Sequence, residues 1–297
     1  MPDAAIRTED LTKLYGKAVG VEGLTFEVLP GEVFGFLGPN GAGKTTTIRT
    51  LLDLIRPTRG RASLFGMDSR GHSVAIHRRI GYLPGELALY DRLTGEEFLI
   101  FMANLRGGVP QGAITRLADR LDAPLHKPIR SLSHGNKQKI GLIQALMHQP
   151  DLLILDEPTL GLDPLAQVEV HRLIREARAE GRTVFLSSHD LAEVEVLCER
   201  VGIIRRGSLV TVEQVEVLRS RAVRRIEARF AEPVSADAFR DLPGVQEVEA
   251  SNSVIRVTVV GSLDPLIKAA AAHTVLDLIS KPPSLEEVFL AYYGDGG

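Results

Sequence analysis

The stretch GPNGAGKTT, residues 38–46, constrains the fold of this chain more than any other feature. It follows an apolar strand pattern, EVFGFLG, and leads into KTTTIRTLLDLI at 44–55, whose apolar residues have helical spacing. A G-x-x-x-x-G-K-[ST] pattern in that setting predicts a loop whose backbone N–H groups wrap phosphates. Lys44 is then placed for the β- and γ-phosphates and the Thr45 hydroxyl for Mg²⁺. The candidate phosphate-binding residues are Gly38, Pro39, Asn40, Gly41, Ala42, Gly43, Lys44, Thr45 and Thr46.

A second strand pattern, LLILDEP at 152–158, is apolar and ends in two acids. Asp156 is suited to hold Mg²⁺, directly or through water. Glu157 is suited to polarise an attacking water. Two adjacent acids at a strand end are often only a solvent-facing cap. Together with the phosphate loop, however, they favour a site that hydrolyses a nucleotide.

Apolar strand patterns alternate with helical ones along most of the chain, which predicts an α/β domain with a mainly parallel sheet. Residues 57–83 are rich in Pro, Gly and Arg and are interpreted as a turn-dense connection into a strand, RRIGYLP at 78–84. Residues 94–149 have helical patterns, and Thr94 with Glu97 forms a capping-box signature. VGIIRRGSLV, at 201–210, has the pattern of a hairpin.

The length of 297 residues suggests two domains. Composition shifts near Leu218, where RSRAVRRIEARF carries five arginines that we interpret as a solvated face or a linker. Short strand patterns and one helical pattern follow, so we expect a small α+β domain at 221–297 after a first domain at 1–220.

Composition also excludes some classes of function. A net charge of −3 gives no indication of nucleic-acid binding, and a single cysteine, Cys198, excludes an intrachain disulfide. The N-terminal residues lack a signal-peptide pattern, and no apolar run approaches the roughly 20 residues that span a bilayer. We therefore expect a cytoplasmic protein; if it works at a membrane, another chain crosses it.

These motifs resemble, in order and over residues 5 to about 215, the ATP-binding subunit of ABC transporters. Tyr15 matches the aromatic residue that stacks on adenine, and LSHGN at 132–136 resembles the family signature LSGGQ. GLD at 161–163 resembles the loop after the acidic pair, and His189 matches the switch histidine. The resemblance implies a P-loop NTPase (RecA-like) core with an ABC β-subdomain and an inserted helical subdomain at about 86–145.

The resemblance also implies how the chain works. Two ATPase subunits of this family meet head to tail, so that Ser133 and Gly135 of one would contact the γ-phosphate of the ATP held by the other. Lys44, Glu157 and His189 would be the catalytic residues, with ATP and Mg²⁺ as cofactors. The partners would be a second ATPase subunit and a separate transmembrane permease, with no nucleic acid. The chain would be peripheral on the inner face of the cell membrane.

Three positions depart from the family pattern. His134 replaces the first glycine of the signature, and Asn136 replaces its glutamine. Gly85, in YLPGE, stands where the family has a glutamine that approaches Mg²⁺ and water. The sequence leaves open whether Glu86, one position later, takes over that role.

The final stretch, PPSLEEVFLAYYG, resembles drug-export ATPase subunits of the ABC-2 type. The alternative is a soluble ABC ATPase that acts on the ribosome or DNA. A GTPase is a third class, because NKQK at 136–139 partly matches the guanine-reading N-K-x-D. Its last residue, Lys139, cannot accept hydrogen bonds from guanine.

Overall fold

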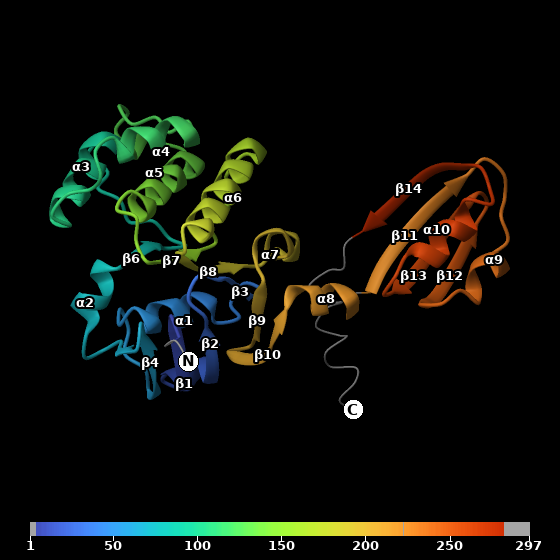
Figure 1. Cartoon of the computed structure of the whole chain (residues 1–297), viewed down its shortest axis with the longest axis horizontal. Coiled ribbons are helices and arrows are strands. Elements are labelled where there is room, and N and C mark those ends of the chain that lie inside the picture. Colours follow the sequence, from blue (N-terminus) through green and yellow to red (C-terminus); the bar gives the residue numbers. More distant parts are fainter. Residues whose placement is uncertain (1–3, 222, 282–297) are drawn as a thin grey trace. The chain divides into compact units, whose positions relative to one another are not determined.

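The computed structural model describes residues 4–221 and 223–281. The chain divides into two compact units, Met1–Val212 and Glu213–Gly297 (Figure 1). This division falls before residue 221, where the composition predicted a boundary, so that helix α8 (Val215–Arg221) groups with the second unit. The stretch PPSLEEVFLAYYG lies outside the described residues.

The first unit is built on a six-stranded sheet of order β10-β9-β3-β8-β7-β6. Strands β9, β3, β8, β7 and β6 pair in parallel. Every residue of β3, β7 and β8 is buried, as expected when both faces of a parallel sheet are covered. The predicted α/β fold is confirmed. The strands are β3 (Val33–Leu37), β6 (Ile80–Leu83), β7 (Leu152–Asp156), β8 (Thr183–Ser188), β9 (Arg200–Arg205) and β10 (Ser208–Gln214).

An aromatic cluster joins this sheet to a second one. Phe34, Phe36 and Phe185 of the parallel sheet pack against Phe26 of β2, with ring centroids 5.5 to 6.3 Å apart. All four are buried. Burial of aromatic rings contributes strongly to stability, so this cluster fixes the two sheets together.

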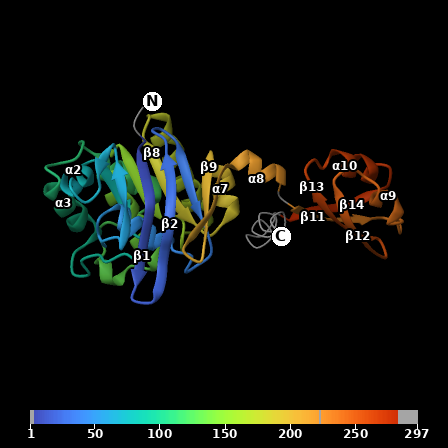
Figure 2. The ribbon, with the colours of Figure 1, turned by 90° about the horizontal axis from the view of Figure 1, so that it is seen from below.

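The second sheet is antiparallel, with the order β2-β1-β4-β5 (Figure 2). Its strands are β1 (Ile6–Tyr15), β2 (Ala18–Val28), β4 (Arg59–Leu64) and β5 (Met67–Asp68). The interpretation of this region as a turn-dense connection is therefore wrong, because it supplies β4, β5 and helix α2 (Ser73–Arg78), whereas the strand predicted at 78–84 is confirmed as β6. In β4 only Ala62 and Leu64 are buried, so the strand lacks an apolar pattern and depends on pairing with β1.

Helices cover the parallel sheet. They are α1 (Lys44–Leu51), α6 (Pro164–Ala179) and α7 (Leu191–Leu197). Helix α1 ends earlier than the pattern to residue 55 predicted. Asp53 has a left-handed φ of 52°, and the N–H groups of Leu54 and Ile55 both donate to the carbonyl of Arg49, which closes the helix.

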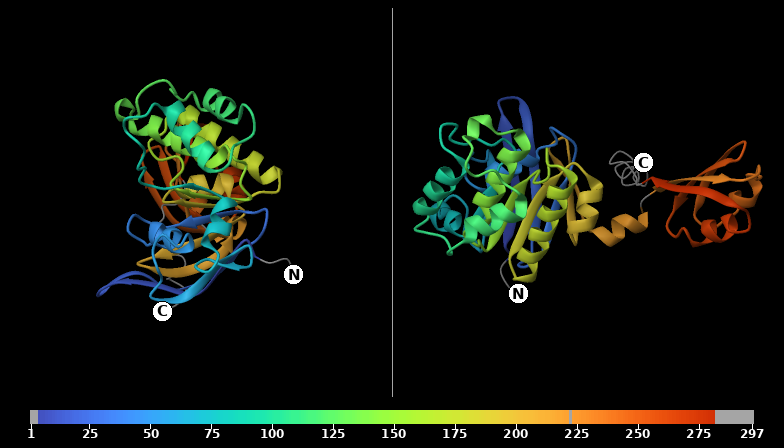
Figure 3. Two further views of the ribbon diagram at one scale, coloured as in Figure 1. Left: turned by 90° about the vertical axis from the view of Figure 1, so that its left-hand side faces the viewer. Right: turned by 90° about the horizontal axis from the view of Figure 1, so that it is seen from above.

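A group of helices lies at one end of the first unit, away from the antiparallel sheet (Figure 3). It comprises α3 (Gly95–Leu105), α4 (Ala113–Leu121), the 3₁₀ turn Ile129–Ser131 and α5 (His134–Leu146). Thr94 and Glu97 form the predicted capping box at the start of α3. Helix α5 packs against β6, which connects this group to the parallel sheet.

The second unit contains a four-stranded antiparallel sheet of order β12-β13-β11-β14. Phe230 and Phe239 are in its core. Its elements after α8 are β11 (Val223–Phe230), α9 (Asp237–Arg240), β12 (Val245–Ser251), β13 (Val254–Val260), α10 (Asp264–Ala270) and β14 (Val275–Lys281). The expected α+β character is observed. Of the two alternatives for the arginine-rich segment, a solvated face fits and a linker does not, because the segment contributes to α8 and β11 and Arg225 and Arg229 are exposed.

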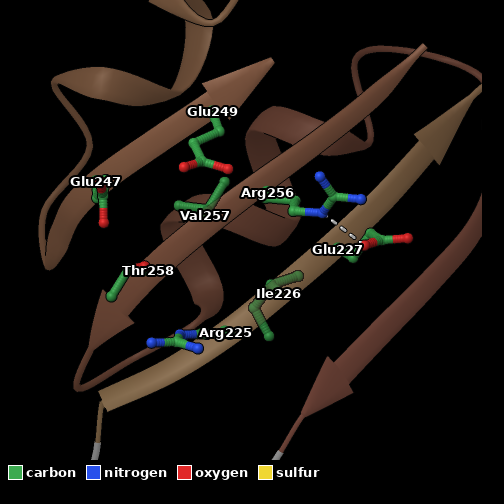
Figure 4. Close-up of a pocket in the computed structure, with 8 residues that line it drawn as sticks. All are labelled: Arg225, Ile226, Glu227, Glu247, Glu249, Arg256, Val257 and Thr258. Atoms are coloured by element: carbon green, nitrogen blue, oxygen red, sulfur yellow. Dashed lines mark hydrogen bonds and ion pairs between the residues drawn. The ribbon is translucent and has the colours of Figure 1, made fainter. Parts of the chain in front are cut away.

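One face of this sheet carries charged side chains around a hollow of about 380 Å³ (Figure 4). Arg256 donates from Nε to Oε2 of Glu227 across the strand pair at 2.8 Å. Glu247 and Glu249 of β12 line the other side. These charges lie on an exposed sheet surface, away from the core of the unit.

Candidate functional site

The three predicted motifs meet at one edge of the parallel sheet. Strands β3, β8 and β7 are neighbours, and the phosphate loop, His189 and the acidic pair follow their carboxyl ends. Ligands of open α/β sheets bind at this edge. Residues separated by more than a hundred positions therefore lie together because the strands are parallel and adjacent.

The phosphate loop depends on glycine where the backbone is crowded. Gly43 has a φ of 112°, and an added Cβ there would lie 2.7 Å from the carbonyl oxygen of Gly20. At Gly38 an added Cβ would lie 2.4 Å from the carbonyl oxygen of Ile204. Helix α1 begins at Lys44, directly after this loop. The N–H groups at a helix start, with the helix dipole, attract phosphate.

Lys44, Glu157 and His189 form a charged cluster. The ammonium of Lys44 lies 3.1 Å from Oε1 of Glu157, and Nδ1 of His189 lies 2.8 Å from Oε2. Lys44 also donates to the carbonyl oxygen of Gly38 at 2.6 Å. Lys44 is only 6% exposed, so its charge is partnered by the carboxylate in a largely desolvated place. The cluster brings a cation, a carboxylate and an imidazole to the phosphate loop.

Asp156 and Thr45 provide oxygen atoms beside this cluster. The Thr45 hydroxyl donates to Oδ2 of Asp156 at 2.7 Å, and the Ser187 hydroxyl donates to Oδ1. Asp156 is fully buried. Burial, with a contribution from the charge of Asp156, raises the pKa of Tyr82 to about 12, so the phenol is neutral at physiological pH.

The hydroxyl and carboxylate oxygens at this position are of the type that Mg²⁺ prefers. Among residues 4–221 and 223–281, no group of three or more His, Cys, Asp or Glu side chains forms a metal-binding cluster. A site that relies on one carboxylate, one hydroxyl and the phosphates of a nucleotide does not need such a cluster.

The departure at Gly85 lies next to Asp156. An added Cβ at Gly85 would be 3.1 Å from Oδ2 of Asp156, so a longer side chain there would start beside the carboxylate. Glu86 is directed to solvent: its side chain is 94% exposed and lies 3.9 Å from Arg49. This geometry gives no support to the idea that Glu86 replaces the glutamine that the family has at the position of Gly85.

Tyr15 lies at the end of β1, close to the phosphate loop. Its ring is near Gly20, where an added Cβ would be 2.7 Å from the ring and 3.1 Å from the methyl group of Thr46. Tyr15 is 50% exposed. A half-exposed ring beside a phosphate-binding loop is able to stack on a flat, apolar group.

Ser133 and Gly135 are at the start of α5. The Ser133 hydroxyl caps the helix by accepting from the N–H of Asn136 at 3.3 Å. An added Cβ at Gly161 would be 2.5 Å from Cδ2 of His134, and one at Gly135 would be 2.5 Å from the carbonyl oxygen of Gly161. The residue that replaces a family glycine therefore packs on the GLD loop of its own chain.

Ser187 and Gln138 also contact the turn at Glu157, and the sequence motifs did not single them out as site residues. Ser187 accepts from the N–H of Glu157 at 3.1 Å, in addition to its bond to Asp156. Gln138 donates to the carbonyl oxygens of Glu157 and Pro158. In the sequence, each is only a polar residue, Ser187 in a mostly apolar strand and Gln138 in a helix, and that is a weak indication of a role in the site.

Glu193 joins the segments after β7 and β8. Its carboxylate accepts from Thr159 at 2.8 Å and from Ser188 at 2.6 Å. Burial alone would raise the pKa of this carboxyl, but the nearby His171, 3.7 Å away, and hydrogen bonds from Ser188 and Thr159 outweigh it and lower the pKa. Glu193 therefore stays ionised and holds the two segments together.

A phosphate loop, an acidic strand end and a histidine on adjacent parallel strands define a P-loop nucleotide hydrolase. A family model described as "ABC transporter" matches residues 21–160. A second model, described as an "AAA domain, putative AbiEii toxin, Type IV TA system", matches residues 126–195.

Similar proteins extend this match over nearly the whole chain. The bacitracin transport ATP-binding protein BcrA of Bacillus licheniformis is 37% identical, covering 98% of each chain. The Nod factor export ATP-binding protein I of Paraburkholderia xenovorans is 34% identical, covering 99% of this chain and 98% of the other. The linearmycin resistance ATP-binding protein LnrL of Bacillus subtilis is 32% identical, covering 97% and 98%.

Solved structures of ATP-binding cassettes also match the fold of this chain. The ATP-binding subunit of an ABC transporter shares 32% identity with a TM-score of 0.66, covering 72% of this chain and 92% of that one. A dimeric ATP-binding cassette with bound ADP and Pi shares the fold, at 23% identity, with a TM-score of 0.63, covering 71% of this chain and 98% of that one.

The chain belongs to the ATP-binding subunits of ABC transporters, in the group whose relatives serve exporters, and it binds and hydrolyses ATP as that family does. The soluble ABC ATPase and the GTPase are not favoured. No helix in the described part of the chain has the length and apolar character to cross a membrane.

Proposed function

We propose that this chain powers a membrane exporter as a head-to-tail homodimer on a separate transmembrane permease. The observation that carries the proposal is the convergence of Lys44, Glu157 and His189 beside the phosphate loop. Relatives named for bacitracin transport, linearmycin resistance and Nod factor export support the exporter. In such a complex the chain is cytoplasmic and peripheral on the inner face of the membrane.

Each ATP is held by residues of one subunit first. Tyr15 stacks on adenine, and residues 38–46 wrap the phosphates. Lys44 exchanges its contacts with Gly38 and Glu157 for the β- and γ-phosphates. Glu157 acts as general base toward water, and His189 contacts the γ-phosphate and orients that water. Catalysis is then mainly positioning and charge stabilisation, as in phosphoryl transfer generally.

Thr45 and Asp156 are the residues that would hold Mg²⁺. The two oxygen atoms already converge, 2.7 Å apart, in a buried position. When bound with ATP, the ion neutralises charge on the phosphates. Ser187 orients Asp156 by donating a hydrogen bond to one of its carboxylate oxygens.

The second subunit completes the site. Ser133 and Gly135, with the N–H groups at the start of α5, contact the γ-phosphate of the partner's ATP. Loss of that phosphate weakens the contact, so hydrolysis opens the dimer. In this proposal residues 1–220 are the ATPase domain, with a helical subdomain at about 86–145. Residues 221–297 are an accessory domain.

The mass of Glu157→Gln protein in solution tests the dimer. By light scattering, the mass should double when MgATP is added, and Ser133→Arg in the same background should abolish the increase. A protein that binds MgATP but stays monomeric would contradict an autonomous trans site. Co-purification of the wild-type chain with an integral membrane protein tests the permease; recovery with ribosomes instead would contradict it.

A further inference from the structure

The backbone of Glu157 has an unusual conformation that requires support. Its φ is 53°, in the left-handed region that residues with a side chain rarely adopt. Its N–H donates to the carbonyl oxygen of Ser187 at 3.2 Å and contacts the Ser187 hydroxyl at 3.1 Å. Such a conformation persists only where the surroundings hold it, and it sets the direction of the Glu157 side chain.

Gln138 holds the other side of this turn. It lies on α5, is 1% exposed, and donates from Nε2 to the carbonyl oxygens of Glu157 at 3.1 Å and Pro158 at 3.2 Å. Because two acceptors face the amide, its nitrogen and not its oxygen must point toward them. The turn is therefore fixed from β8 through Ser187 and from α5 through Gln138.

Packing does not explain a glutamine at this position. Within the described part of the chain, Oε1 of Gln138 is buried and has no hydrogen-bond partner. A buried polar atom without a partner costs stability, and an apolar side chain of similar volume would avoid that cost. The feature that an apolar side chain cannot supply is the pair of bonds to residues 157 and 158.

We propose that Gln138 is a positioning residue, which sets the Glu157 carboxylate for hydrolysis from the same helix that Ser133 caps. One turn of α5 separates His134, which packs on Gly161, from Gln138. A rigid helix thus connects the start of α5 to the catalytic turn of the same subunit. The inference rests on the proposed function, since it takes Glu157 as the general base.

The test compares Gln138→Met with Gln144→Met in the full chain. Gln144 lies on the same helix, is half-buried, and receives the same substitution. For Gln138→Met we expect the kcat for MgATP, measured by phosphate release, to fall roughly 10- to 100-fold, because a small misplacement of a catalytic group has effects of that size. The Kd for MgADP, measured by calorimetry, should stay within about twofold, because Gln138 does not form the phosphate loop. Gln144→Met should keep both values.

Two results would overturn the inference. One is a wild-type kcat in Gln138→Met. The other is an equal loss of kcat and MgADP affinity in both variants, which would indicate general damage to α5. If Gln138→Met does not fold, Gln138→Leu carries the same comparison.

The inference and the proposed function fail in different ways. If Glu157→Gln does not dimerise with MgATP, the proposed function fails whatever Gln138 does. If it dimerises, and Gln138→Met hydrolyses ATP normally, only the role of Gln138 fails. Gln138→Met combined with Glu157→Gln should still dimerise, because the amide acts on the base and not on association.

Discussion

Ser187→Ala removes two hydrogen bonds from the centre of the site. The hydroxyl donates to Oδ1 of Asp156 and accepts from the N–H of Glu157, and both Ser187 and Asp156 are fully buried. A hydrogen bond to a charged group contributes about 1.5–3 kcal/mol and a neutral one about 1 kcal/mol. Thr45 still donates to the other oxygen of Asp156. The N–H of Glu157 keeps its bond to the carbonyl oxygen of Ser187, so the loss is mainly that of the bond to Asp156, and the free energy of unfolding should fall by about 1.5–3 kcal/mol.

Urea unfolding followed by circular dichroism measures this change. The chain has two compact units, so the relevant transition is the one that MgADP moves to higher urea concentration. The Kd for MgADP should rise about tenfold, because Asp156 loses a donor that orients it. Ser208→Ala, at an exposed position of β10, is the control. A decrease below about 0.5 kcal/mol for Ser187→Ala would refute the reasoning.

Three further changes test other parts of the structure. Burial lowers the pKa of His148 to about 4 from an ordinary 6.5, so the unfolded chain gains a proton first as the pH falls. The unfolding free energy should decrease by up to about 3 kcal/mol between pH 6.5 and 4, and the urea midpoint of His148→Phe should vary less over that range. Gly43→Ala should abolish MgADP binding in calorimetry, because the added Cβ would lie 2.7 Å from the carbonyl oxygen of Gly20 and would displace the phosphate loop. Wild-type MgADP affinity in this variant would contradict that reasoning. Arg256→Ala breaks an exposed ion pair and should leave the midpoint of urea unfolding within error of wild type, because solvent screens such pairs.

The fold was predictable where the pattern of burial is simple. Strands β3, β7 and β8 are buried on both faces and are therefore apolar throughout, so their sequences identify them. β4 was missed because its first three residues are exposed and its partner β1 lies some fifty positions earlier. Pairing with another strand supplies the backbone hydrogen bonds of β4, and no local pattern reports it.

The same contrast applies to the site. Local spacing determined the residues of the phosphate loop, the acidic pair and the helix caps, because a short loop, a strand end and a first helical turn each impose their own residue types. Only the tertiary structure decided that Glu157 lies between Lys44 and His189, and that Ser187 and Gln138 hold its turn. These contacts join positions from 19 to 113 residues apart in the sequence. They exist because parallel strands end at one edge of the sheet and a helix packs beside them, an arrangement that depends on the burial of the whole core.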